Sequence, residues 1–175
     1  DARDLRAAKP PAAVREKGAA LLVQWSPLSA APRQISVLRA SNNLSDFRME
    51  FEVQPNVKTA GWVFRAKDSK NYYAIKLEAA SIGRDPFVLR RFAVVDGREQ
   101  SGSSISVPAS LRTGAIYKVR TEAVGNQFTT WISENKVDEW NDARLNAGGV
   151  GLYSDRGEPS TVVGALNVYP LIKKK

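Results

Sequence analysis

The chain contains neither cysteine nor histidine among its 175 residues. Without cysteine it has no disulfide and no thiolate nucleophile, and without both residue types it has no zinc site built from thiolate or imidazole ligands. A Ser-His-Asp triad is also excluded, because no imidazole is present to act as the general base. Any catalysis would therefore have to use carboxylates, lysine, tyrosine or a metal ion bound through oxygen.

Long apolar runs are absent as well. No stretch approaches the roughly 18 apolar residues that a membrane-spanning helix needs, so we expect no membrane span in this chain. Residues 1–20 lack the apolar segment of a signal peptide, and the chain begins at Asp1 and not at methionine. We therefore expect a trimmed or processed product.

The net charge of +8 lies mainly near the two ends of the chain. Residues 1–20 hold five basic and three acidic residues, and residues 173–175 are three lysines, which leaves 18 basic and 15 acidic residues between them. A basic tail on a nearly balanced body is a weak indication of nucleic-acid binding. We interpret the lysines as a solvated tail and expect no specific nucleic-acid partner.

Apolar and polar residues alternate in several segments, which is the period of a strand with one buried face. In residues 46–53, for example, Phe47 and Met49 alternate with the charged Arg48 and Glu50. Trp62, Phe64 and Tyr73 are expected in the core. The predicted strands lie in residues 33–40, 46–53, 61–66, 71–78, 116–124, 127–133, 137–140, 148–154 and 162–170.

Turn residues separate these strands, notably Gly125 with Asn126 and the segment 133–136. Because the predicted strands follow one another closely and no long helix is expected after residue 20, we predict an all-β, two-sheet antiparallel jelly-roll sandwich. The predicted organisation is a linker-like segment with a short helix at 1–20, the sandwich at 21–170 and a basic tail at 171–175.

Five segments occur along the chain in an order that resembles a known family. They are DFRMEFEVQP, AGWVFRAKDSKNYYAIKLE, YKVRTEAVGNQFTTWISENKVDEW, GGVGLYSD and ALNVYP, within roughly residues 35–170. The chain resembles the concanavalin A-like lectin/glucanase superfamily, and especially laminin G-like modules and the bacterial 3-keto-disaccharide hydrolase-like domain of unknown function. The resemblance implies a jelly roll with a curved concave face, which in this superfamily often binds glycans.

The sequence departs from the family pattern in three places. The acidic E-x-D-x-x-E cluster of the glucanase branch is absent, since Glu50 and Glu52 only follow a strand alternation. The histidines of several enzymatic branches have no counterpart here. Ser-Glu-Asn-Lys at 133–136 replaces the frequent Asn-Gly turn, and we expect Asn135 to adopt the positive φ. These departures favour a binding module over a glucanase.

Six residues that we expect on strands, one of them (Arg90) outside the strands named above, are candidate carbohydrate contacts. Aromatic rings pack against the C–H faces of sugars, and guanidinium groups bind hydroxyl or carboxylate oxygens, so the arginines would suit an acidic glycan. Two alternatives remain open, namely an internal ion pair of Arg65 with Glu50 or Glu78 and a solvated sheet face with cross-strand ion pairs. The candidates are Arg65, Tyr72, Lys76, Arg90, Arg120 and Trp131.

We expect a non-catalytic binding module of the bacterial cell envelope or exterior, with an oligo- or polysaccharide as its ligand and other domains in a longer protein. One alternative is a glycoside hydrolase-like enzyme that uses carboxylates, and another is a structural or protein-interaction domain. No cofactor is expected. Calcium at Asp138, Glu139 and Asp142 is an alternative without the usual D-x-D-x-D spacing.

Overall fold

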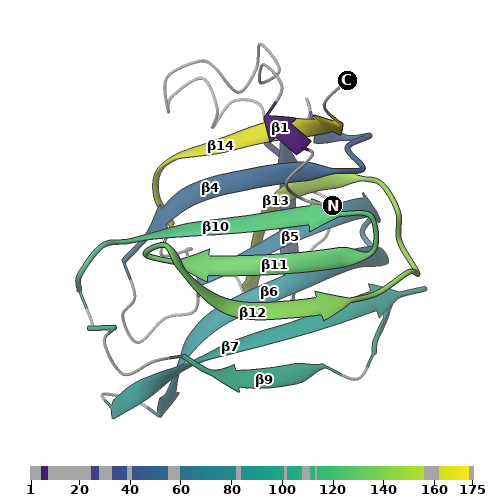
Figure 1. Ribbon diagram of the computed structural model, residues 1–175. Helices are drawn as coiled ribbons and strands as arrows, with labels where there is room; N and C mark the ends of the chain where they lie inside the picture. Colours follow the sequence, from purple (N-terminus) through teal and green to yellow (C-terminus); the bar gives the residue numbers. More distant parts are fainter. Residues whose placement is uncertain are drawn as a thin grey trace.

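The computed structural model describes residues 5–7, 25–27, 33–38, 41–54, 60–81, 84–100, 102–107, 111–112, 114–155 and 162–173. Two antiparallel sheets, sheet A and sheet B, pack face to face (Figure 1). The described residues contain no α-helix, and so no helix among them is long and apolar enough to cross a membrane. The predicted all-β, two-sheet sandwich is confirmed, whereas the helix predicted within residues 1–20 lies outside the described residues.

Sheet A has six strands and forms the front layer of the sandwich in Figure 1. The strands 117–124, 127–132 and 135–141 are successive hairpin neighbours, whereas the strand 47–53 pairs with strands that are distant from it in the sequence. In spatial order the strands are β1 (Leu5–Ala7), β14 (Val162–Lys173), β4 (Phe47–Val53), β10 (Tyr117–Val124), β11 (Gln127–Ile132) and β12 (Asn135–Asn141).

Sheet B has eight strands and lies behind sheet A (Figure 1). Seven of them follow one another in the sheet, and the eighth, β9 (Ser103–Ser106), pairs with β7. The spatial order of the seven is β2 (Trp25–Pro27), β3 (Arg33–Leu38), β13 (Gly149–Asp155), β5 (Ala60–Asp68), β6 (Asn71–Ser81), β7 (Arg84–Val95) and β8 (Arg98–Glu99).

The two ends of the chain meet at the edge of sheet A. Strand β1 pairs with the end of β14, so that Leu5 lies opposite Lys173 and Ala7 opposite Leu171 (Figure 1). Parts of the predicted linker and of the predicted basic tail therefore belong to the sandwich, and its observed limits are wider than residues 21–170.

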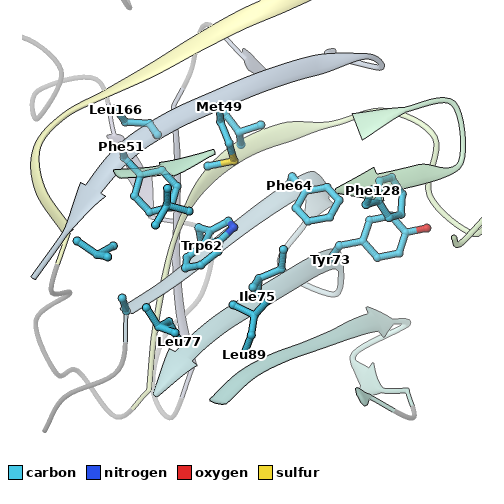
Figure 2. Packing of buried hydrophobic residues seen from close by; sticks show 14 of the residues in the cluster. Met49, Phe51, Trp62, Phe64, Tyr73, Ile75, Leu77, Leu89, Phe128 and Leu166 are labelled. Carbon is cyan, nitrogen blue, oxygen red and sulfur yellow. The ribbon is translucent and has the colours of Figure 1, made fainter. Parts of the chain in front are cut away.

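The main core lies between the two sheets and is rich in aromatic side chains (Figure 2). Phe64 of β5 packs edge-on against Phe128 of β11, with 4.9 Å between the ring centroids. Trp62 is fully buried, and its Nε1 donates a hydrogen bond to Thr121 Oγ1 of sheet A at 3.1 Å. Burial of Trp62, Phe64 and Tyr73 is confirmed. These contacts across the layers hold the sheets together.

The face of sheet B that points away from sheet A is also buried. Val63 and Ala74 are fully buried there, and Tyr72 is only 2% exposed. This second cluster explains why β5 is apolar on both sides, as expected for a central strand. Its members are Ile35, Val37, Val63, Ala66, Tyr72, Ala74, Phe92, Val94 and Tyr153.

The turn between β11 and β12 corrects one expectation. Positive φ angles occur at Ser133 (50°) and Glu134 (69°), whereas Asn135 already belongs to β12 and lies opposite Ile132. The expected positive φ at Asn135 is therefore wrong. A two-residue hairpin loop needs both of its central residues in the left-handed region to match the twist of the strands.

Candidate functional site

The face of sheet A that points away from sheet B is polar, and we call it the open face. It arises from the period of two, because every second residue of β4, β10 and β11 enters the core and the residues between them point outward. Its described side chains are Arg48, Glu50, Glu52, Lys118, Arg120, Glu122, Gln127, Thr129, Trp131, Lys136, Glu139, Asn167 and Tyr169.

The strand register places these side chains in two neighbouring rows that cross the sheet. Side chains directly opposite each other on adjacent strands are close enough to interact. One row is Asn167, Glu50, Arg120, Trp131 and Lys136, and the other is Tyr169, Arg48, Glu122, Thr129 and Glu139.

Arg120 and Trp131 form the centre of the first row. The Arg120 guanidinium carbon lies 4.2 Å from the centroid of the Trp131 ring, which is a close cation–π contact. Arg120 Nε is buried and has no hydrogen-bond partner among the described residues, and its distance to Glu122 Oε1 is 3.8 Å. The open face thus presents an aromatic ring that is restrained by a guanidinium group.

Charges on the open face balance. Arg48 Nε donates a hydrogen bond to Glu122 Oε1 at 2.7 Å, and Lys118 Nζ lies 3.9 Å from Glu50 Oε2. Over β4, β10 and β12, four basic side chains face four acidic ones. The basic set is Arg48, Lys118, Arg120 and Lys136, and the acidic set is Glu50, Glu52, Glu122 and Glu139.

Three of the six candidate residues lie on the outer side of sheet B instead. Lys76 of β6 lies opposite Arg90 of β7. Tyr72 comes four residues before Lys76 on β6 and points to the same side of the sheet. Tyr72 is 2% exposed and Lys76 is 7% exposed, whereas Arg90 is half-buried. The core of the sandwich separates these three from Arg120 and Trp131. The structure therefore does not gather the six candidates on one face.

Lys76 and Arg90 each contact neighbours within sheet B. Lys76 Nζ lies 3.8 Å from Glu78 Oε2, and Arg90 forms an ion pair with Glu99. The Arg90 guanidinium also lies 5.2 Å from the centroid of the Phe92 ring. Arg90 and Glu99 form a cross-strand ion pair, as in the expected alternative of a solvated sheet face, whereas Lys76 is buried and its partner lies on the same strand. A glycan contact at these residues stays a prediction.

Arg65 has a structural role between the two sheets. A φ of 48° at Arg65 accompanies an irregularity in the pairing of β5 with β6, and its side chain lies over the Phe128 ring at 5.0 Å. It donates hydrogen bonds to the carbonyl oxygens of Ser45 (3.2 and 2.9 Å) and Leu145 (3.2 Å). Burial lowers the pKa of Arg65, and the nearby Asp46 opposes this effect.

The expected ion-pair partners of Arg65 were wrong. The carboxylate near Arg65 Nη2 is that of Asp46, at 3.6 Å, and not that of Glu50 or Glu78. Glu50 points away from the core on the open face. The positive φ turns the Arg65 side chain out of the simple alternation, so the sequence period assigned it to the wrong side of β5.

The acidic residues considered for calcium face guanidinium groups. Asp138 accepts a hydrogen bond from Arg91 Nη1 at 2.8 Å, and Asp142 is paired with Arg144. In the part of the chain that the structure describes, no group of three or more carboxylates is arranged to hold a metal ion. Calcium binding stays a prediction from the resemblance alone.

Comparison with known proteins identifies the fold. No family matches the sequence, and no curated protein matches it. The structure is similar to the carbohydrate-binding module CBM66 from Bacillus subtilis, with a TM-score of 0.59, 19% identity and coverage of 87% of this chain and 96% of that one. It is also similar to toad ovary galectin in complex with thio-digalactose, with a TM-score of 0.56, 14% identity and coverage of 79% and 99%.

A third solved structure, sheep galectin-11 in complex with glycerol, matches with a TM-score of 0.54 and 6% identity, over 78% of this chain and 95% of that one. At these identities the similarity concerns the fold and not a shared set of site residues. The chain has a lectin-like jelly-roll fold.

Proposed function

We propose that this chain is a non-catalytic carbohydrate-binding module whose ligand lies across the open face of sheet A. The observation that carries the proposal is the Arg120–Trp131 pair at the centre of a polar, cross-strand row. Glycan-binding sites combine an aromatic surface for sugar C–H groups with convergent polar groups for the hydroxyls. A carbohydrate-binding module and a galectin with a bound disaccharide analogue share the fold, which supports the proposal.

The Arg120–Trp131 contact would help binding by restraining both side chains before the ligand arrives. Immobilising a flexible side chain on binding costs about 0.5–1.5 kcal/mol, so an already ordered pair costs less. The Arg120 side chain is 26% exposed, so its guanidinium group would donate to a sugar hydroxyl. Glu50 and Glu122 lie opposite and beside Arg120 and would accept hydrogen bonds from hydroxyl groups.

The balanced charges favour a neutral glycan. A face with equal numbers of acidic and basic side chains gives no net attraction to a polyanion, unlike the acidic glycan suggested by the arginines alone. A sugar hydroxyl both donates and accepts, so it suits a face on which carboxylates alternate with guanidinium and ammonium groups. We also propose that the chain lies outside the cytoplasm and is part of a longer protein. Only the family resemblance supports these two points.

A glycan-array screen at low and moderate salt tests this function. We expect selective binding to neutral glycans that persists at moderate salt, and Trp131→Ala should weaken it by about tenfold or more, because a stacked ring contributes roughly 1–2 kcal/mol. Arg120→Ala should weaken it as well. Arg98→Ala, which removes an exposed arginine of sheet B, is the matched control.

Two results would contradict the proposal. Binding to neutral glycans that is unchanged in Trp131→Ala and Arg120→Ala would place the site elsewhere. Binding only to polyanions, lost at moderate salt, would indicate nonspecific attraction to the basic chain.

A further inference from the structure

A pocket of about 420 Å³, which we call the edge pocket, is lined by residues of β12 in sheet A and the segment after it and by residues of β7 and β9 in sheet B. Its volume falls within the range of about 300–1,000 Å³ that is usual for small-molecule sites. The polar side chains and the one aromatic ring that line it and matter here are Arg91, Ser103, Glu139, Trp140, Asp142 and Arg144.

The inner wall of the pocket is an incomplete polar network. Arg91 Nη1 donates to Asp138 Oδ1 at 2.8 Å and to the Glu139 carbonyl oxygen at 3.3 Å, and the Arg91 guanidinium lies 5.2 Å from the Trp140 ring centroid. The Asp138 side chain is only 5% exposed. Asp138 Oδ2 and Trp140 Nε1 are buried without a hydrogen-bond partner among the described residues.

Such orphaned groups indicate that something is missing from the network. A buried polar atom without a partner costs about 1–3 kcal/mol, and native proteins contain few of them. Trp140, which carries the unpaired donor Nε1, lines the pocket, whereas Asp138, which carries the unpaired acceptor Oδ2, is not a lining residue and is bonded to Arg91, which is. A hydroxyl group, which can both donate and accept, suits a pocket with such mixed polar groups.

Hydrogen bonds to a core side chain hold the rim of the pocket in place. Tyr73 donates a hydrogen bond from its hydroxyl group to Asp142 Oδ1 at 2.6 Å and accepts one from the Leu145 amide at 2.9 Å. Burial would raise the pKa of Asp142, but the hydrogen bonds from Arg144 and Tyr73 lower it, so the carboxylate stays ionised. Arg144 is 42% exposed and is fixed by this carboxylate. The rim therefore offers an oriented guanidinium to a ligand.

We propose that this edge pocket is a second ligand site, which binds a single neutral sugar residue. Its donors (Arg91, Ser103, Arg144) and acceptors (the Glu139 carbonyl oxygen and Asp142) are mixed, and its two guanidinium groups are offset by the carboxylates of Asp138 and Asp142. A charged ligand would gain no net attraction there, whereas sugar hydroxyls can use both kinds of group.

The edge pocket adjoins the open face through Glu139, which lines the pocket and also lies opposite Thr129 in the second row. One glycan chain could therefore occupy both sites. The inference nevertheless goes beyond the proposed function, because a free sugar can enter the pocket whether or not the open face binds a glycan.

Tryptophan indole signals in ¹H–¹⁵N spectra separate the two sites. The chain has four tryptophans, and spectra of Trp131→Phe and Trp140→Phe assign the two signals of interest. The probes are glucose, galactose, mannose and fructose, with glucuronate as the charged comparison. We expect at least one neutral hexose to shift the Trp140 signal, in the wild type and also in Trp131→Ala, and glucuronate to bind more weakly. The Trp62 indole, bonded to Thr121 in the core, is the internal reference.

Arg144→Ala tests the lining, with Arg98→Ala as the matched control for an exposed arginine. We expect Arg144→Ala to weaken the hexose titration of the Trp140 signal by about tenfold, since a hydrogen bond to a charged group contributes about 1.5–3 kcal/mol, and the control to leave it unchanged.

Each of the other possible outcomes supports or contradicts the edge pocket, the open face or both. A Trp140 signal that no neutral hexose shifts would overturn the inference, and if the Trp131 signal moved in the same experiment the proposed function would survive alone. Movement of the Trp140 signal with a silent Trp131 would support the pocket and count against the open face. Tighter binding of glucuronate, or full binding in Arg144→Ala, would overturn the site as described.

Discussion

Replacing Arg65 with methionine lowers the free energy of unfolding by about 3 kcal/mol or more. Methionine fills much of the volume but donates no hydrogen bond, so the carbonyl oxygens of Ser45 and Leu145 lose the bonds that Arg65 gives them. The Leu145 carbonyl oxygen is buried, and a buried acceptor left without a partner costs about 1–3 kcal/mol. The cation–π contact of Arg65 with Phe128 is lost as well. Urea denaturation measures the effect through the transition midpoint at an unchanged slope.

Arg98→Met is the matched control, because Arg98 is exposed on β8. Exposed substitutions of this kind usually change stability by less than about 0.5 kcal/mol. If Arg65→Met were as stable as Arg98→Met, the structural role that we assign to Arg65 would be contradicted. The prediction from the sequence that Arg65 contacts a ligand would then be favoured.

Gly151→Ala lowers the free energy of unfolding by more than about 3 kcal/mol, because strands β3 and β13 approach too closely for any side chain at this position. A Cβ at Gly151 would lie 1.8 Å from the Ser36 carbonyl oxygen and 2.7 Å from Val37 Cα, both of which are backbone atoms. Gly151 lies opposite Val37 in the sheet, so relief requires the two strands to separate. Thermal and urea unfolding both measure this loss.

Gly125→Ala separates the clash from the general cost of replacing a glycine. Gly125 has a φ of 58° in the turn between β10 and β11, and a Cβ there would meet nothing within 4 Å. The expected cost is only the strain of a left-handed residue, about 1–2 kcal/mol. Equal losses in the two variants would show that the approach of β3 to β13 is not as close as described.

The sequence predicted the fold well because strand alternation is a local signal. Phe47 and Met49 enter the core and Arg48 and Glu50 point outward, as the period of two requires. The same alternation predicted the wrong side of β5 for Arg65, because a positive φ at this residue interrupts the alternation in the middle of the strand. Neither composition nor spacing signals such an irregularity.

The candidate site was predicted only in part, because its geometry depends on which strands pair. Arg120 and Trp131 are hairpin neighbours, and a short turn makes their proximity predictable. Tyr72 shows the same alternation, but the sheet to which its strand belongs and the burial of that sheet's outer face are tertiary properties. The second row was missed for a related reason, since the pairing of Tyr169 with Arg48 joins strands far apart in the sequence.

The edge pocket could not be predicted from local sequence patterns. Its acidic residues stood out in the sequence as a cluster after β11, but Arg91 comes from β7 of the other sheet. Only the packing of the two sheets reveals that Asp138 is paired with Arg91, whereas Asp142 is paired with Arg144, two residues further along the chain.

The central claim is that a glycan lies across the open face of sheet A. The most direct test is a chemical-shift map of the backbone amides, recorded with the glycan that binds most tightly on the array. The account predicts that the largest changes fall on Lys118–Glu122 and Gln127–Trp131, together with the Trp131 indole. Changes confined to β5, β6 and β7, with an unaffected Trp131, would contradict it.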